Sequence, residues 1–237
     1  MNSAVYSLSA TMVNQLNRVD VLSNNIANAN TNAFKEDNLV EGSFNYYLTK
    51  SKENNREITR QNIINNTIPK IDGDYIKGDV GSITPTGNKL DFALKGNEVF
   101  FKIKNSNGDM LLTRDGSFKN INGFLSTSQS DKVLNADNKP IEIAEGFEGQ
   151  ISLVQTPFTN LKKMGNNSYF SEDSKKIETI LINASHMLQG SIERSNVNTV
   201  SAMVALIDSQ RRLEQSQKAL VGIDEINGKL ITQIGNK

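Results

Sequence analysis

Both ends of the chain carry apolar side chains at intervals of three and four residues, the spacing of one helical face. An isolated helix gains little stability from propensity alone, so each helix must bury its apolar stripe. The ends therefore predict two long amphipathic helices that need partners. The first stripe consists of Leu8, Met12, Leu16, Val19, Leu22 and Ile26, and the second of Val200, Val204, Ile207, Leu213, Leu220, Ile223 and Leu230.

We expect the first helix within residues 1–34, ending near Asn30, because asparagine tolerates the left-handed conformation of a helix end. The second is expected within 186–237. Leu206, Leu213 and Leu220 follow at seven-residue intervals, the seam spacing of a coiled coil. The two helices are predicted to form an antiparallel coiled-coil pair. Two helices alone leave much of each stripe exposed, so packing on other copies of the chain, as in a polymer, is the natural solution.

In the middle of the chain the apolar period changes from 3.6 to 2, as in Leu90–Leu94. Asn107–Gly108 and Asn122–Gly123 are dipeptides that favour tight hairpins. These signals predict a compact antiparallel β domain at 74–157. The flanking segments 35–73 and 158–185 are polar and weakly patterned, and they are expected to be connectors. The predicted fold class is α+β.

Charge and composition exclude several classes of function. The chain has 26 basic and 26 acidic residues, so it lacks the basic excess of a nucleic-acid binder. It contains no cysteine and one histidine, which excludes thiol nucleophiles and CxxC zinc sites. No apolar run is long enough for a membrane span. The first residues have no basic segment of a secretory signal peptide, so we expect export without a cleavable signal, if the protein leaves the cytoplasm.

Two segments resemble ligand-binding motifs, but neither has the residue spacing that its motif requires. Residues 81–89 resemble a phosphate loop, but five residues separate the glycines and Asn88 precedes Lys89. Residues 72–79 resemble a calcium loop but lack glycine at the sixth position. The residues next to His186 form no pattern typical of a catalytic site, so His186 is expected to be a packing residue. The sequence therefore predicts no catalytic residue, no cofactor, no metal and no small-molecule substrate.

The segment from Val19 to Lys35, which contains Ser-Asn-Asn-Ile-Ala-Asn-Ala-Asn-Thr-Asn-Ala-Phe-Lys, resembles the N-terminal signature of the bacterial flagellar axial proteins, the rod and hook group. Ala33 stands where that family usually has glycine. Residues 86–96 and 112–118 resemble the family's central β blocks. Residues 190–198 and 210–214 resemble its C-terminal signature. The resemblance thus covers both ends and the middle of the chain.

One small β domain in 237 residues is more similar to the rod types than to the longer hook type, and the length favours a proximal-rod over a distal-rod type. The resemblance implies a structural subunit of the flagellar basal-body rod, which spans the periplasm and carries torque from motor to hook. It implies export by the flagellar type III apparatus. The implied partners are other copies, neighbouring rod proteins and the surrounding rings.

Within the N-terminal signature the asparagines cannot all lie on one helical face, so several must address partners other than the apolar seam. We expect at least two of them to make hydrogen bonds within or between subunits, and Phe34 to be an apolar anchor where the chain leaves the helix. A solvated helix end is the alternative. The predicted assembly signature consists of Asn24, Asn25, Asn28, Asn30 and Phe34.

Two other classes of function stay open at this point. A secreted enzyme or binding module with helical arms would show a catalytic constellation in the β domain. A generic coiled-coil scaffold would form an isolated two-chain coiled coil without a tubular assembly.

Overall fold

A computed structural model describes residues 2–42, 70–171, 177–180 and 186–235. The chain divides into two compact units. The helical unit contains residues 1–26, 37–75 and 199–237, and the β unit contains residues 27–36 and 76–198. The β unit therefore includes a short piece of chain directly after the first helix, and the two signatures at the chain ends both contribute to it.

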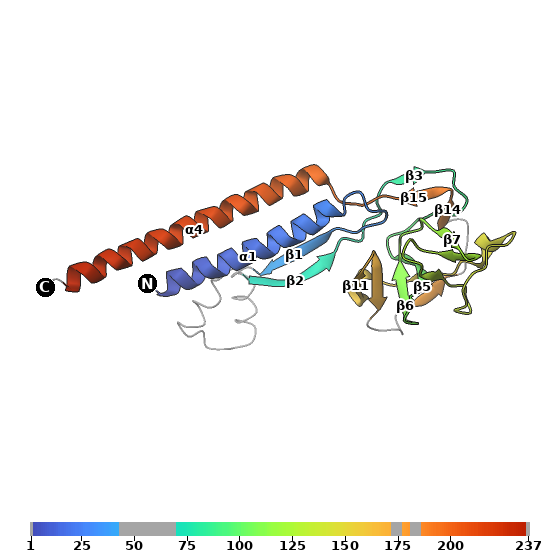
Figure 1. The fold of residues 1–237 in the computed structure, drawn as a ribbon, viewed down its shortest axis with the longest axis horizontal. Coiled ribbons are helices and arrows are strands. Elements are labelled where there is room, and N and C mark those ends of the chain that lie inside the picture. The colour runs from blue at the N-terminus through green and yellow to red at the C-terminus, as the bar shows by residue number, and fades with distance from the viewer. Residues whose placement is uncertain (1, 43–69, 172–176, 181–185, 236–237) are drawn as a thin grey trace, which may run out of the picture. The chain divides into compact units, whose positions relative to one another are not determined.

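The helical unit contains α1 (Asn2–Ala27), α4 (Thr199–Gly235) and a two-stranded sheet of β1 (Asp37–Gly42) and β2 (Lys70–Ile76). In Figure 1, α1 and α4 run side by side in opposite directions. Arg18 and Leu22 of α1 line one pocket together with Ala205 and Ser209 of α4, which places these faces toward each other. The two predicted helices are confirmed. Coiled-coil interlocking of their side chains stays a prediction.

The C-terminal helix begins later than residue 186. Two strands, β14 (Met187–Gln189) and β15 (Ser191–Glu193), precede it. They pair antiparallel with β4 (Phe92–Leu94) and β3 (Ile83–Pro85). Gly190 between them has a φ of 72°, which a right-handed helix does not accept. These partners lie about a hundred residues away, so local periodicity did not reveal the pairing.

Within the described residues the β unit has a nine-stranded sheet, in which seven strands follow the order β11-β12-β6-β5-β9-β8-β7 and β10 pairs with both β5 and β13. Every strand pair with a described register is antiparallel, which confirms the predicted central antiparallel region. The strands are β5 (Val99–Lys104), β6 (Met110–Thr113), β7 (Lys119–Ile121), β8 (Phe124–Ser126), β9 (Lys132–Val133), β10 (Leu153–Gln155), β11 (Leu161–Gly165), β12 (Ser168–Ser171) and β13 (Glu178–Ile180).

The sheet extends beyond the expected end of the β domain at residue 157. β11, β12 and β13 fall in the segment 158–185 that was expected to be a connector. Tyr169 is fully buried against Phe100 and Phe158, whereas its neighbour Phe170 is exposed, so only part of this hairpin faces the core. The apolar pattern is therefore weak. β1 and the first part of β2 also lie in the expected connector 35–73, of which residues 43–69 are outside the described part.

The main core of the β unit is built from aromatic and aliphatic side chains of both the early and the late strands. The Phe101 and Phe118 rings meet edge to face with centroids 5.0 Å apart. Gly116 allows the chain to approach β4 closely, since its carbonyl accepts a hydrogen bond from Phe92 N–H at 2.9 Å. A Cβ at Gly116 would overlap the Phe92 carbonyl oxygen, so a larger residue does not fit.

Candidate assembly site

The face of α4 toward α1 repeats small and leucine side chains. Ala202, Ser209 and Ser216 are buried and lie seven residues apart. Leu206, Leu213 and Leu220 lie between or beside them and are half-buried. Alternation in steps of four and three gives the heptad pattern of a helix seam. The predicted residues Leu213, Leu220 and Ile223 therefore lie on the inward face.

The other predicted α4 residues lie on a different face. Val200 is 71% exposed, Val204 63% and Ile207 50%. Together these three form the outer stripe of α4, and they lie with Arg211 along one face of this helix. The sequence pattern had merged two faces of α4 into one stripe. Leu230 is helical, but its side chain is outside the described part.

The predicted stripe of α1 is also only partly covered. Leu8, Met12, Val19, Leu22 and Ile26 are half-buried, whereas Leu16 is 47% exposed. The buried positions of this helix are polar instead: Asn14, Gln15 and Asn25. Large apolar side chains on both helices of the unit thus remain available for contact.

Asn25 connects the end of α1 to β1 through two side-chain hydrogen bonds. Its amide nitrogen donates to the Asp37 carbonyl at 2.8 Å, and its amide oxygen accepts from the Asp37 N–H at 3.0 Å. The side chain is 1% exposed, so these bonds replace water for both backbone groups of Asp37. Asn25 thus acts as a backbone partner inside the helical unit.

The remaining signature residues occupy the turn after α1. The Asn28 side chain accepts a hydrogen bond from Thr31 Oγ1 at 3.2 Å, while Asn24 and Asn30 are exposed. Two of the four asparagines thus have described side-chain hydrogen bonds within the subunit. Phe34 is 6% exposed and lies under the Lys163 ammonium, 4.2 Å from the ring centroid. Contacts of these residues with other subunits stay a prediction.

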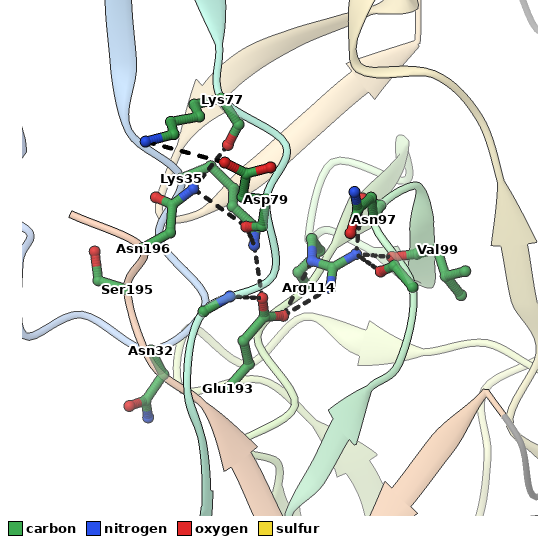
Figure 2. A network of polar contacts seen from close by, with 12 residues as sticks. Asn32, Lys35, Lys77, Asp79, Asn97, Val99, Arg114, Glu193, Ser195 and Asn196 are labelled. Carbon is green, nitrogen blue, oxygen red and sulfur yellow. Dashed lines mark hydrogen bonds and ion pairs between the residues drawn. The ribbon is translucent and has the colours of Figure 1, made fainter.

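A cluster of buried charges lies where the chain ends enter the β unit (Figure 2). Glu193, the last residue of β15, accepts from Lys35 Nζ at 2.6 Å through Oε1. Its Oε2 accepts two bonds from the Arg114 guanidinium, at 2.8 and 3.0 Å. All three side chains have no exposed surface. They bring together the N-terminal signature, a central block and the C-terminal signature.

The cluster holds two cations and one carboxylate, and backbone oxygens compensate the excess. Arg114 Nη1 donates to the carbonyls of Gly96, Asn97 and Val99 at 2.8–3.1 Å, and Lys35 Nζ donates to that of Asp79 at 2.6 Å. Burial, together with the nearby Arg114 charge, lowers the pKa of Lys35 from 10.5 to about 8, against the opposing effect of Glu193. The buried site therefore disfavours the charged form of Lys35 relative to water.

All three residues lie in signature blocks of the sequence, but nothing in the sequence pairs them. Glu193 lies 158 positions from Lys35 and 79 from Arg114, so no spacing rule pairs them. The available signal for a buried ion cluster was that each of them is a charged residue within a block of mostly apolar or turn-forming residues. Buried charges require partners, but the sequence does not say which.

A last candidate position is His186, which the sequence predicts to be a packing residue. His186 lines an open pocket of about 420 Å³ with Lys95, Glu98 and Gln155. Across the described ranges, no group of three His, Asp or Glu side chains is placed to hold a metal ion. In the same ranges no helix has the length and hydropathy to cross a membrane.

The fold and the site define a class of structural protein, in which a β unit is joined to a pair of terminal helices with uncovered apolar faces. Comparison with known families gives matches at both ends of the chain. The family described as "Flagella basal body rod protein" matches residues 6–35, and "Flagellar basal body rod FlgEFG protein C-terminal" matches residues 188–233. The first match ends at Lys35 and the second includes Glu193.

Curated relatives extend the similarity over the whole chain. The flagellar basal-body rod protein FlgF of Mesorhizobium japonicum is 28% identical over the full length of both chains. The rod protein FlgG of Buchnera aphidicola subsp. Baizongia pistaciae is 27% identical over 90% of this chain and 92% of its own. The hook-basal body complex protein FlhO of Bacillus subtilis is 25% identical over 99% of both. The chain thus carries both terminal domains of the flagellar basal-body rod family, and it is similar over most of its length to rod proteins of the FlgF and FlgG type.

Proposed function

We propose that the chain is a structural subunit of the flagellar basal-body rod that assembles through its terminal helices. The observation that carries the proposal is the outer stripe of α4, whose Val200, Val204 and Ile207 are at least half exposed. This stripe lies within the matched C-terminal rod domain. Burying one such side chain stabilises by roughly 1.5–3 kcal/mol, so a few per interface, repeated around a polymer, give a stable assembly.

The occupant that we propose for the outer stripe is a terminal helix of a neighbouring copy or of an adjacent rod protein. Tyr6, Val13 and Leu16 of α1 are exposed by 69, 55 and 47% and supply apolar surface of the same kind. The inward face of α4 is already covered within the subunit. We infer that each subunit uses one helix face for its own partner helix and another for its neighbours, and we propose that the helical pair lies at the inner wall of a tube.

We further infer that the subunit is of the proximal-rod FlgF type, with the distal-rod FlgG type as the alternative. The FlgF relative of Mesorhizobium japonicum aligns over all of both chains, and the FlgG relatives align over 90 to 96% of this chain. In the assembled rod the subunit would transmit torque across the periplasm, within the surrounding rings. We propose export by the flagellar type III apparatus without a cleavable signal peptide.

Substitution on the outer stripe tests the assembly mechanism. Ile207→Asp places a charge on the proposed interface, and an unpaired buried charge costs several kcal/mol. We expect exported but unassembled protein and loss of motility. Ala219→Asp is the matched control, because it introduces the same charge at another exposed position of α4 and should leave assembly unchanged.

Two results would count against the proposal. Normal rod assembly by Ile207→Asp would show that the outer stripe is not an interface. Equal loss of assembly in the Ala219→Asp control would show that α4 tolerates no added charge, and the effect would then not be specific to the stripe.

A further inference from the structure

Three segments of the β unit continue directly into the helical unit. They are residues 27–36 after α1, residues 76–82 after β2 and residues 191–198 before α4. None belongs to the nine-stranded sheet. Their attachment to one another therefore depends on other contacts.

Glu193 contacts the other two segments through side chain and backbone. Its backbone carbonyl accepts from Ala33 N–H at 2.8 Å, and its carboxylate accepts from Lys35 Nζ. The same carboxylate oxygen accepts from Gly81 N–H at 2.9 Å. Arg114 then ties the other carboxylate oxygen to the sheet. One side chain thus joins the three segments and the end of β6.

Asn196 repeats this arrangement three residues further on. Its amide oxygen accepts from Glu36 N–H at 2.8 Å, and its amide nitrogen donates to the carbonyls of Lys77 and Asp79 at 2.8 and 3.2 Å. Asn196 therefore bridges the same three segments. Unlike Glu193 it is a neutral and more exposed bridge, so its bonds are individually weaker.

The buried charges make Glu193 the stronger of the two bridges. Hydrogen bonds to charged groups are worth more than neutral ones, and a buried cation that loses its partner is strongly destabilising. Without the carboxylate, Lys35 and Arg114 would be two buried cations with only carbonyl partners. Residues 27–36 contain no strand, so hydrogen bonds of a β-sheet cannot hold this segment in place of the Glu193 carboxylate.

We propose that Glu193 is a positioning residue that clamps the three connecting segments into one cooperative piece, distinct from the core of the sheet. The clamp fixes where the chain leaves the β unit toward each helix. It is complete only when residues from both ends of the chain are present. This role goes beyond assembly through the helix faces and does not depend on it.

Amide hydrogen exchange on the full-length chain tests the clamp, because each segment contains a reporter. The N–H groups of Ala33, Gly81 and Arg194 are all hydrogen-bonded, the last to the Ser82 carbonyl at 2.9 Å. In Glu193→Gln all three should exchange faster by about tenfold or more, while strand β5 keeps its protection. Glu145→Gln, which changes an exposed carboxylate, is the matched control and should change none of them.

The clamp is overturned if only Gly81, the amide bonded to the carboxylate, accelerates, since the segments would then open independently. It is also overturned if β5 accelerates equally, since Glu193 would then be an ordinary core residue. Should Glu193→Gln fail to fold, Lys35→Met is measured instead at the same amides. Joint acceleration of the three segments supports the clamp, and unchanged exchange at Arg194 refutes it.

Discussion

Lys35 and Glu193 lie 158 positions apart in the sequence, and their side chains meet at 2.6 Å with no exposed surface. The pair joins the last residue matched by the N-terminal rod family to a residue of the C-terminal one. The two ends of the chain therefore meet inside the β unit as well as along the helices. Both ends are needed before the charges in this cluster are satisfied.

The first prediction concerns pH. The folded-state pKa of Lys35 is lowered to about 8 from 10.5, so between these values the unfolded chain binds more protons and stability rises with pH. The gain is at most roughly 3 kcal/mol. Urea unfolding followed by circular dichroism at several pH values should show this rise, and Lys35→Met should reduce it. An identical slope in both proteins would contradict the assignment.

The second prediction concerns Ala33, which has a φ of 54° and is 1% exposed. Glycine would relieve about 1–2 kcal/mol of left-handed strain but would lose a buried methyl and restrict the chain less when unfolded. These effects nearly cancel, so Ala33→Gly should lie within about 1 kcal/mol of the parent. Ala33→Val should be destabilised by about 2 kcal/mol or more in the same denaturation experiment. Equal stability of the two variants would exclude the strained turn.

The third prediction compares a seam residue with the histidine. Leu213→Asp should prevent polymer formation, because the half-buried leucine lies on the face of α4 toward α1. His186→Ala should leave assembly and motility nearly unchanged. Electron microscopy of rods and a motility assay measure both. Loss of motility in His186→Ala with intact rods would revive an enzymatic interpretation.

The fourth prediction concerns Asn25. Asn25→Ala removes the two side-chain hydrogen bonds to the Asp37 N–H and carbonyl, each worth roughly 0.5–1.5 kcal/mol. We expect its critical concentration for polymerisation to rise well above that of Asn24→Ala, whose side chain is exposed. Equal critical concentrations would mean that the Asn25 bonds do not support the assembling helix.

The fifth prediction concerns the close approach at Gly116. Gly116→Ala should destabilise the β unit by about 2 kcal/mol or more, because the added methyl overlaps the Phe92 carbonyl and forces the backbone apart. Gly149→Ala is the control, since a Cβ there meets nothing within 4 Å. Thermal unfolding of both variants measures the difference. Similar melting temperatures would show that the chain relaxes around the methyl at little cost.

The sequence by itself determined the features that arise from neighbouring residues. The three-and-four spacing from Leu8 to Ile26 predicted α1, and the period of two with asparagine–glycine turns predicted the antiparallel β region. The Asn-rich block carried the resemblance to the flagellar axial proteins. Helical and strand periods are set by backbone geometry within a few residues, and for that reason they can be read locally.

Only the tertiary structure decided the features that depend on distant partners. α4 begins at Thr199 and not near residue 186, because β14 and β15 pair with strands about a hundred residues earlier. The division of α4 into an inward row and an outer stripe depends on where α1 lies. The ion cluster of Lys35, Arg114 and Glu193 is the clearest case, because a charged residue signals that a buried partner is needed while only the folded chain selects it.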